Sequence, residues 1–224
     1  ASLEDPPHSA SHNILGFLNV ADAVRAAGTV RLVYASSAAV YGSPEMLPLD
    51  EGASCRPTSP YGLEKSIDEQ YAQLYQALYG VSALGLRYFN VYGPRQDPAS
   101  PYAGVISRFA ANIAADSPLT VFGDGQQTRD FVFVGDIARA NVAALKSSYQ
   151  GVVNVGTGKS VSLLELIDAL ARCAGRSPQV RFDPPVPGDI RDSAMRPERM
   201  RDILGFVPST ALEDGLTRLL AASR

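Results

Sequence analysis

The sequence predicts an α/β protein built on a doubly wound parallel sheet, and two observations support this. Segments with apolar residues at helical spacing alternate with short apolar runs that have the composition of strands. Polar residues suited to ligand binding follow directly after two of these runs, at Ser37 and at Asn90. Alternating strands and helices favour parallel strands joined by right-handed crossovers. Because ligands bind at the carboxyl ends of such strands, we expect a ligand site there.

The composition is that of an ordinary globular protein. Of the 224 residues 46% are apolar and 19% charged, and the formal net charge of −3 gives no reason to expect nucleic acid as a partner. No apolar run approaches the roughly 20 residues of a membrane span and the start does not resemble a signal peptide, so we expect no membrane partner and a cytoplasmic location. Cys55, Cys173, His8 and His12 lack metal-ligand spacing, so we expect no metal and free thiols.

The first half of the chain has clear boundary signals. Gly28 has the position of a helix C-cap residue, Ser59 is a good N-cap, and Pro60 suits the first helical position. Together with the apolar spacing, these residues predict four elements in chain order: a helix over 11–27, a strand over 30–35, a helix from Tyr61 to about residue 79, and a strand over 82–88.

The second half is less regular. Ser162 and Glu165 form a capping-box pattern that opens a helix, and the prolines of 184–187 keep that segment out of regular structure. The elements expected here are a helix over 103–116, a strand over 119–122, a turn at 123–125, a strand over 130–134, a helix over 136–146, a strand over 152–155 and a helix from 162 to about 173.

One short segment has the residues of a proton-transfer site. Tyr61 and Lys65 are i and i+4 on a predicted helix and therefore share one face. An ammonium beside a phenol stabilises the phenolate, which would let Tyr61 act as a general base and acid. Ser37, at the end of a strand facing that helix, could bond the same substrate oxygen. Such a pair alone is usually an amphipathic surface pair, so its significance depends on the neighbouring motifs.

Those neighbouring motifs carry a family resemblance. Residues 35–42, 59–65 and 86–98 occur in this order, and together they resemble the extended short-chain dehydrogenase/reductase superfamily and, within it, the nucleotide-sugar 4-epimerases. The resemblance runs over essentially the whole chain. It implies a Rossmann-type NAD-binding domain in residues 1–94 and 128–150, and a smaller C-terminal α/β lobe that binds the nucleotide sugar in 95–127 and 151–224.

The resemblance also implies a missing part. Family members begin with a strand, a glycine-rich turn and a helix that hold the pyrophosphate of the cofactor, and this chain has no such segment. We therefore expect the sheet to be N-terminally incomplete and the sequence to be a fragment of a longer protein, with a natural truncation as the alternative. The choice between NAD and NADP does not follow from the residues present.

Site roles follow from the resemblance. The catalytic residues are Ser37, which bonds the reacting sugar oxygen, Tyr61, which transfers the proton, and Lys65, which tunes Tyr61 and bonds the nicotinamide ribose. The cofactor would contact these three and His12, Asn13 and Phe89. The substrate would contact Asn90 and Arg129 at the diphosphate, Val105, Ile106, Thr120, Val121 and Phe122 beside uracil, Asp189 at the nucleotide ribose, and Ser193 at the sugar.

Several of these assignments have plain structural alternatives. His12 could be a partly exposed helix-start residue, Phe89 and the apolar residues beside uracil could belong to the core, and Arg129 could pair with Asp130 on the surface. The chain also departs from the family pattern. Val186 stands where an arginine is usual, so that phosphate contact is lost or supplied by another group such as Arg191, and Arg196 stands where aspartate is frequent.

Ser193 bears on the choice of sugar. A bulky tyrosine at this position confines the family's pocket to plain hexoses, whereas a small side chain leaves room for an N-acetyl group. Serine is small, and the segment from Arg95 to Ile106 also resembles the N-acetylhexosamine branch. An exposed loop serine would give the same sequence.

The fold alone does not choose the reaction, because it supports epimerases, dehydratases and decarboxylases. Dehydratases carry an Asp-Glu pair where this chain has Ala38 and Ala39, which disfavours dehydration. We therefore expect an isomerase that performs NAD-dependent 4-epimerisation of UDP-N-acetylglucosamine and UDP-N-acetylgalactosamine through a 4-keto intermediate. A UDP-glucose or UDP-glucuronate 4-epimerase, a related reductase, or a non-catalytic nucleotide-sugar-binding remnant would also be compatible with the motifs. A homodimer is expected through a four-helix contact of the helices at 11–27 and Tyr61.

Overall fold

The structure is a computed structural model, and it describes residues 2–28, 31–100, 103–186 and 190–222. The chain divides into two compact units. The first comprises Ala1–Phe89, Ala138–Val155 and Arg196–Val207, and the second comprises Asn90–Ile137, Gly156–Met195 and Pro208–Arg224. The lobe boundaries that the resemblance implies stay a prediction. No helix in the described ranges is long and apolar enough to cross a membrane.

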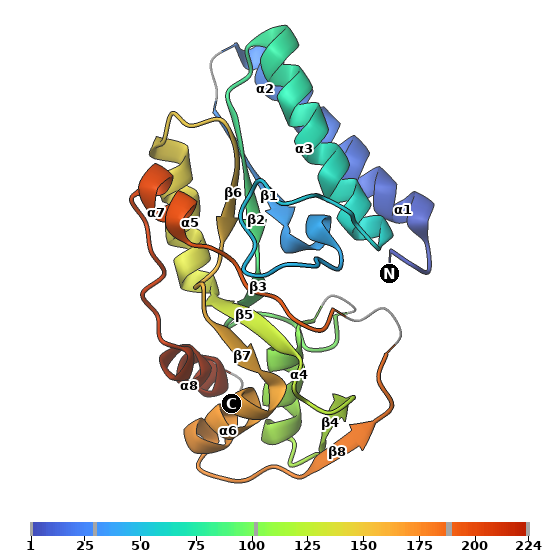
Figure 1. Cartoon of the computed structure of the whole chain (residues 1–224), viewed down its shortest axis with the longest axis vertical. Coiled ribbons are helices and arrows are strands. Elements are labelled where there is room, and N and C mark those ends of the chain that lie inside the picture. Colours follow the sequence, from blue (N-terminus) through green and yellow to red (C-terminus); the bar gives the residue numbers. More distant parts are fainter. Residues whose placement is uncertain (1, 29–30, 101–102, 187–189, 223–224) are drawn as a thin grey trace. The chain divides into compact units, whose positions relative to one another are not determined.

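The first unit is built on a parallel sheet of three strands in the order β1-β2-β6 (Figure 1). These strands are β1 (Leu32–Ser37), β2 (Ala83–Tyr88) and β6 (Gly151–Val155). Five consecutive residues of the central strand, 83–87, are buried, and because side chains alternate between the two faces, both faces of this strand are covered. Ser37 pairs with Tyr88 and Tyr88 with Val155, so the carboxyl ends of the three strands coincide. The predicted parallel α/β architecture is confirmed.

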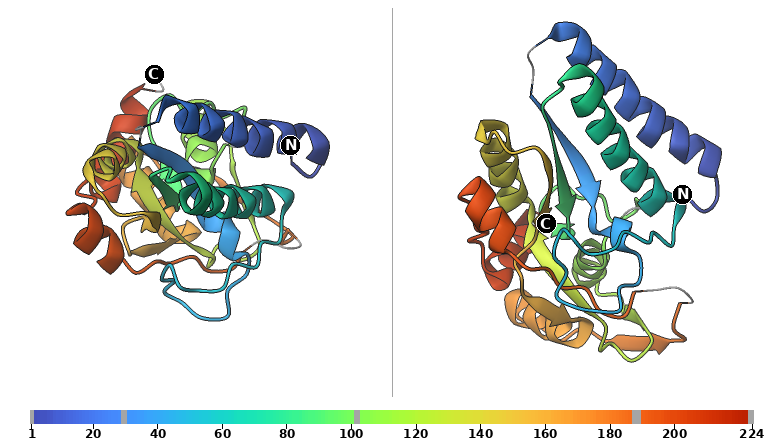
Figure 2. Two further views of the ribbon diagram at one scale, coloured as in Figure 1. Left: turned by 90° about the horizontal axis from the view of Figure 1, so that it is seen from above. Right: turned by 45° about the horizontal axis from the view of Figure 1, so that its top comes forward.

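Two long helices packed side by side cover one face of this sheet (Figure 2). The first consists of α1 (Pro6–Ala10), a π-helical turn, η1 (Ser11–Leu15), and α2 (Gly16–Ala27), and the second is α3 (Pro60–Tyr79). The first helix begins before the predicted residue 11 because Asp5 caps it, accepting from the N–H of His8 at 3.0 Å. Pro6 occupies the first helical position.

The predicted caps of these helices are present. The Ser59 hydroxyl oxygen accepts from the N–H of Gly62 at 3.1 Å and so begins α3. Gly28 ends α2 and Gly80 ends α3, with φ of 85° and 70°, a conformation that favours glycine. The first and last residues of α3 are thus set by local signals at its two ends.

Helices also cover the other face of the sheet (Figure 1), which makes the sheet doubly wound. They are α5 (Val134–Lys146), whose first residues belong to the second unit, and α7 (Glu198–Leu204). The Tyr88 hydroxyl donates to the Asn141 side chain at 3.0 Å, and Arg31 donates to the carbonyl of Ala144 at 2.9 Å, so both the carboxyl and amino ends of the sheet are tied to α5.

In the residues that the structure describes, the second unit contains two small sheets and three helices. Strands β3 (Asn90–Tyr92), β5 (Thr128–Phe133) and β7 (Ser160–Ser162) form one sheet, and β4 (Leu119–Phe122) pairs in parallel with β8 (Val180–Asp183). The helices are α4 (Val105–Ala114), α6 (Leu163–Ala174) and α8 (Leu212–Ala222). Phe109, Leu166, Leu170 and Leu216 form part of their shared core. The capping box predicted at the start of α6 is present.

Candidate active site

The hydroxyl of Ser37 is fixed at the carboxyl end of β1. Its Oγ accepts from the N–H of Ala39 at 3.1 Å and caps a 3₁₀ turn, η2 (Ala38–Tyr41). A hydroxyl that accepts from the backbone in this way keeps its own hydrogen for another partner. Ser37 can therefore donate a hydrogen bond at the end of the sheet where a ligand is expected.

The first two turns of α3 carry Tyr61 and Lys65, and the helix packs against η2. Gly62 allows this close packing, since a Cβ there would lie 2.5 Å from the carbonyl oxygen of Ala39. The Lys65 ammonium lies 5.9 Å from the centre of the Tyr61 ring, so the two side chains share one face of the helix. The first unit therefore brings the predicted catalytic residues, Ser37, Tyr61 and Lys65, onto adjoining elements.

Two carboxylates of α3 lie buried next to this turn, and the sequence did not indicate either. Glu64 accepts from the Ser9 hydroxyl at 2.8 Å and from the Asn13 amide at 2.6 Å. Asp68 is 1% exposed and accepts from Lys65 at 3.3 Å. Burial raises the pKa of Asp68 to about 6, against the opposing effect of the Lys65 charge. The predicted cofactor residue Asn13 thus has its amide engaged with α3.

A third buried carboxylate, Glu69, ties α3 to the sheet. Its oxygens accept from Arg87 at 2.8 and 2.6 Å and from the Ser36 hydroxyl at 2.5 Å. Arg87 also donates to the Tyr41 hydroxyl at 2.8 Å. Ser36, which precedes the predicted catalytic serine, is buried, and its hydroxyl is engaged with Glu69 of the helix.

Two other predicted cofactor residues differ in burial. His12 is exposed on η1, where its Nδ1 lies 2.9 Å from the carbonyl oxygen of His8 and the two rings are 4.3 Å apart. Phe89 is 5% exposed at the carboxyl end of β2, and its N–H donates to the carbonyl of Val155 at 3.0 Å. Their contacts with a cofactor stay predictions.

The predicted diphosphate residues lie in the second unit. Asn90 opens β3 beside Phe131 of β5, and Arg129 of β5 donates to the carbonyls of Thr128 at 2.8 Å and Arg191 at 3.3 Å. The Asp130 carboxylate accepts from the N–H of Gly158 at 2.7 Å. Arg129 and the backbone of Arg191 are thus adjacent.

The side chain of Arg191 is already paired. Its guanidinium donates to both oxygens of Asp124, at 2.8 and 2.9 Å, and these bonds lower the pKa of Asp124 to about 2. Both side chains are more than half exposed, so the pair is screened by water. These two bonds use two of the five N–H donors of the Arg191 guanidinium.

The segment that contains Ser193 is held by its neighbours. The Thr128 hydroxyl donates to Asp192 at 2.8 Å, and the Ser160 hydroxyl donates to the backbone carbonyl of Ser193 at 2.9 Å. The Ser193 side chain takes no part in that bond and is half-buried. The remaining predicted ribose contact, Asp189, lies outside the described residues.

The five residues predicted beside uracil divide into two groups. Ile106 and Val121 are buried in the core of the second unit, and Val105 packs against it. The neighbours of Val121 on β4 point away from that core: Thr120 accepts from Arg181 at 3.3 Å, and Phe122 is 42% exposed. Thr120 and Phe122 therefore keep surface for a ligand, whereas Ile106 and Val121 do not.

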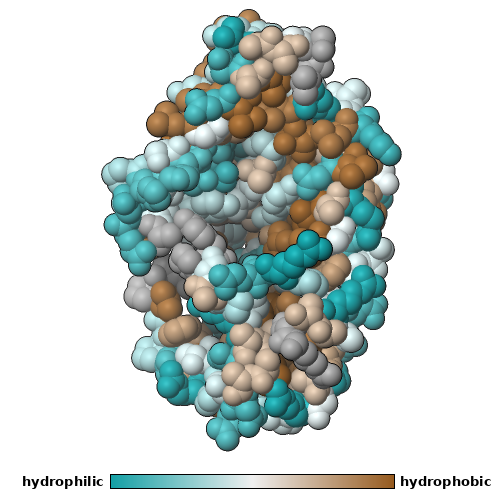
Figure 3. Space-filling model, turned by 180° about the vertical axis from the view of Figure 1, so that it is seen from behind, coloured by the Kyte–Doolittle hydropathy of each residue, from teal (hydrophilic) through white to brown (hydrophobic). Residues whose placement is uncertain are grey.

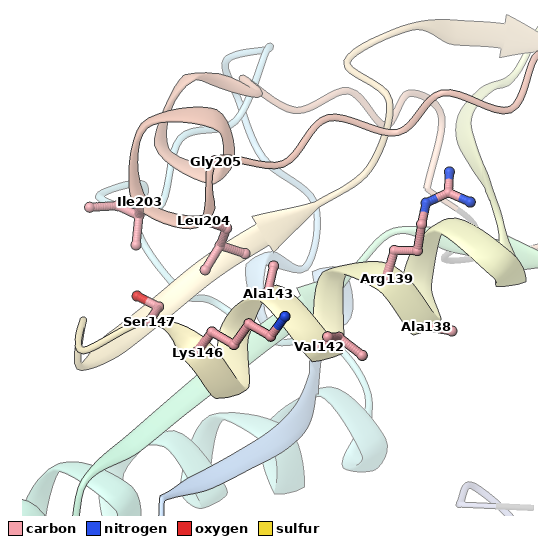
Figure 4. A pocket seen from close by; sticks show the side chains of 9 residues that line it. All are labelled: Ala138, Arg139, Val142, Ala143, Lys146, Ser147, Ile203, Leu204 and Gly205. Atoms are coloured by element: carbon pink, nitrogen blue, oxygen red, sulfur yellow. The ribbon is translucent and has the colours of Figure 1, made fainter.

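A separate depression of about 710 Å³ lies between α5 and α7 of the first unit (Figure 4). Val142, Ala143 and Leu204 line it, with Arg139 and Lys146 at its border. Figure 4 shows Leu204 reaching from α7 toward α5. None of the predicted site residues lines this depression. Within the described ranges, no cluster of histidine, cysteine and acidic side chains could hold a metal ion.

These features define a class of protein. A parallel doubly wound sheet whose strand ends carry a serine, beside a helix that begins with a tyrosine and a lysine one turn apart, is the arrangement of the short-chain dehydrogenase/reductase class. A family model described as the NAD dependent epimerase/dehydratase family matches residues 1–156. The chain belongs to this family, and NAD is the family's cofactor.

Individual relatives of this chain are described as sugar-nucleotide epimerases. The chain is 41% identical over 220 residues to a protein of Methanocaldococcus jannaschii described as a putative UDP-glucose 4-epimerase, covering 98% of this chain and 71% of the relative.

Solved structures of UDP-sugar 4-epimerases are also similar to this chain. The UDP-N-acetylglucosamine 4-epimerase of Methanobrevibacter ruminantium, in complex with UDP-N-acetylmuramic acid, has a TM-score of 0.96 at 34% identity, covering 99% of this chain and 71% of that one. The UDP-glucose 4-epimerase of Thermus thermophilus, in complex with NAD, has a TM-score of 0.91 at 38% identity, covering 99% and 73%. The chain is thus a member of the UDP-sugar 4-epimerase group.

The close packing at Gly62 gives a testable prediction. In Gly62→Ala the new methyl group would meet the Ala39 carbonyl, so the first turn of α3 must move away from η2. Overpacking of this kind costs about 1–3 kcal/mol of stability, and a shift of about 1 Å in the reacting groups can lower turnover roughly a hundredfold. Steady-state kinetics and urea denaturation measure both effects.

Gly16→Ala is the matched control. It lies on the neighbouring helix, and a Cβ there meets nothing within 4 Å. The substitution should leave turnover unchanged and raise the free energy of unfolding by about 0.5–1 kcal/mol, since alanine favours helix. Equal turnover in the two variants would show that Gly62 does not set the geometry of the site.

Proposed function

We propose that this protein interconverts UDP-N-acetylglucosamine and UDP-N-acetylgalactosamine by NAD-dependent 4-epimerisation. The observation that carries the proposal is the arrangement of Ser37, Tyr61 and Lys65 on adjoining elements of the first unit. The small side chain of Ser193 and the similarity to the UDP-N-acetylglucosamine 4-epimerase of Methanobrevibacter ruminantium support the choice of sugar.

The donor groups of the first unit fit the nicotinamide end of NAD. Lys65 has three N–H donors, and its bond to Asp68 uses one of them, which leaves the others for ribose hydroxyls. The Ser37 hydroxyl keeps its hydrogen, and Phe89 lies at the carboxyl end of β2. When bound, NAD supplies a reversible hydride acceptor.

The side chains of this protein transfer the proton and position the substrate. Tyr61, as phenolate, removes the proton of the C4 hydroxyl while Ser37 bonds that oxygen, and Lys65 stabilises the negative phenolate. The C4 hydrogen would leave as a hydride to bound NAD, which gives a 4-keto sugar, and the same hydride would return to C4 after the sugar has turned. The keto sugar then rotates so that the opposite face of C4 points toward the cofactor, while Arg129 and Asn90 hold the diphosphate. Tyr61 finally returns its proton to the C4 oxygen. The proton balance over one turnover is zero.

A UDP-glucose 4-epimerase is the second candidate. It is favoured by the 41% identity to the Methanocaldococcus jannaschii protein described by that activity. A dehydratase is disfavoured by Ala38 and Ala39, which stand in place of the Asp-Glu pair that dehydration uses. A non-catalytic remnant is disfavoured by the complete set of Ser37, Tyr61 and Lys65.

We also propose a homodimer through the outer faces of α2 and α3. Leu15, Val20, Leu74 and Leu78 are each more than half exposed on η1, α2 and α3. Figure 3 shows hydrophobic side chains gathered on the upper part of one face, at the end of the molecule where Figure 1 draws α2 and α3. An apolar helix face of this kind is typical of a protein interface.

Light scattering at micromolar concentration should give twice the monomer mass; monomer alone would contradict the proposal.

The proton-transfer role of Tyr61 predicts the effect of Tyr61→Phe. Loss of a general acid-base group lowers turnover roughly a hundredfold or more, while the dissociation constant for UDP should stay the same because the phenol does not hold the nucleotide. Stopped-time epimerisation assays and calorimetry with UDP measure the two effects. Tyr79→Phe, at the far end of the same helix, should keep normal turnover. Normal turnover in Tyr61→Phe would remove Tyr61 from the mechanism.

The role of Ser193 predicts a change of substrate in Ser193→Tyr. A tyrosine would fill the acetamido volume, and overpacking costs about 1–3 kcal/mol, so activity on the N-acetylated pair should fall roughly ten- to a hundredfold while UDP-glucose and UDP-galactose are spared. Coupled assays on both pairs measure this. Ser193→Ala is the matched control, because the bond from Ser160 goes to the backbone carbonyl and is kept. Equal losses on both pairs would show that Ser193 does not contact the C2 substituent.

A further inference from the structure

The buried carboxylate of Asp68 has fewer hydrogen-bonding partners than the other buried carboxylates of α3. Asp68 is 1% exposed. One carboxylate oxygen, Oδ2, accepts from the Lys65 ammonium at 3.3 Å, whereas Oδ1 is buried and has no hydrogen-bond partner within the described residues. Buried polar atoms are nearly always bonded, so an orphaned carboxylate oxygen requires an explanation.

The neighbouring carboxylates of α3 have stronger support. Glu69 is held at two points by Arg87, and Glu64 accepts from two side-chain donors. Asp68 has Lys65 as its single hydrogen-bonding partner in the described structure. The stability of its charged form thus depends on this one ammonium.

The charged and titratable groups around Asp68 come from α3, β1 and β2. Lys65 stabilises its charge, and Glu64 and Glu69 oppose it, but burial is the largest influence and raises the pKa of Asp68 to about 6. On β1 the phenol of Tyr34 is buried, and it feels the negative charge of both Asp68 and Glu69. Arg87 of β2 is engaged with Glu69. Asp68 therefore changes its charge close to neutral pH.

We propose that Asp68 is a positioning residue that holds the Lys65 ammonium beside Tyr61, and that protonation of Asp68 releases it. The inference rests on the proposed function, because it assumes that Lys65 supports proton transfer by Tyr61. Asp68 lies one turn beyond Lys65 on the same helix and is out of solvent, so its carboxylate fixes one end of the flexible lysine side chain.

The direction of the pH dependence follows from the charge. Above about pH 6 Asp68 is a carboxylate and Lys65 is held; below it Asp68 is neutral and the attraction is lost. Turnover should therefore fall on the acidic side of pH 6. The free energy of unfolding should instead rise as the pH falls, because the pKa of Asp68 in the folded protein lies above the value of about 3.9 in the unfolded chain. The free energy of unfolding contributed by this group rises as the pH falls from about 6 to about 4.

Asp68→Asn separates the positioning role from a structural one. The substitution keeps the shape and removes the buried charge, so the variant should be at least as stable as the natural enzyme at pH 7. Its turnover at pH 8 should fall at least about tenfold, the scale of a misplaced reacting group, and the acidic limb near pH 6 should disappear. Asp202→Asn is the control, since Asp202 is an exposed acid paired with Arg201 at 2.9 Å and should change neither property.

The experiment measures turnover of the NAD-loaded enzyme against pH for the three proteins, together with thermal denaturation. A second readout does not depend on activity: the ¹³Cε shift of Lys65, assigned by its loss in Lys65→Arg, should move near pH 6 in the natural protein and stay constant in Asp68→Asn. An unchanged acidic limb in Asp68→Asn, or loss of turnover only in proportion to lost stability, would overturn the inference. Absence of epimerase activity in the natural enzyme would instead overturn the proposed function, and the Lys65 shift would still test the ion pair.

Discussion

The buried ion pair of Arg87 and Glu69 is the interaction on which the geometry of the first unit depends. Glu69 lies on α3, Arg87 on the central strand β2, and the same carboxylate accepts from Ser36 on β1. Removing one partner of such a pair leaves an uncompensated buried charge, at a cost of about 3–5 kcal/mol. The pair therefore fixes the angle and height at which α3 lies on the sheet, and with it the position of Tyr61.

This pair is part of a longer chain of buried hydrogen bonds. Arg87 donates to the hydroxyl of Tyr41, which in turn donates to Asn154 on β6 at 2.7 Å. Burial raises the pKa of Tyr41 to about 12, so the phenol stays neutral and keeps its donor hydrogen. The N–H of Asn154 donates to Glu51 at 2.8 Å. All three strands and the turn after Ser37 are thus connected, and a fully bonded buried network of this kind specifies one arrangement.

The sequence predicted those parts of the fold that depend on local signals. Ser59, Gly28 and the pair Ser162 and Glu165 act on backbone groups within a few residues, so they can be recognised without the tertiary structure. The three-residue strands β3 and β7 are too short to show a period. The buried acids of α3 were missed because a charged residue on an amphipathic helix usually faces water. Only the fold shows that Glu64, Asp68 and Glu69 point inward, and the roles of the site residues stay predictions.

The helix α3 carries both the predicted reacting groups, Tyr61 and Lys65, and three buried carboxylates, Glu64, Asp68 and Glu69. Replacing buried ion pairs by apolar residues is often neutral or stabilising, so such charges are weak evidence for stability. They do supply directional bonds at defined distances, and a reacting phenol and ammonium require such fixed positions. Gly62 lets the helix approach the turn after Ser37, Glu69 fixes the helix on the sheet, and Asp68 restrains Lys65. If Tyr61 and Lys65 react as proposed, these buried polar contacts serve their orientation more than the stability of the fold.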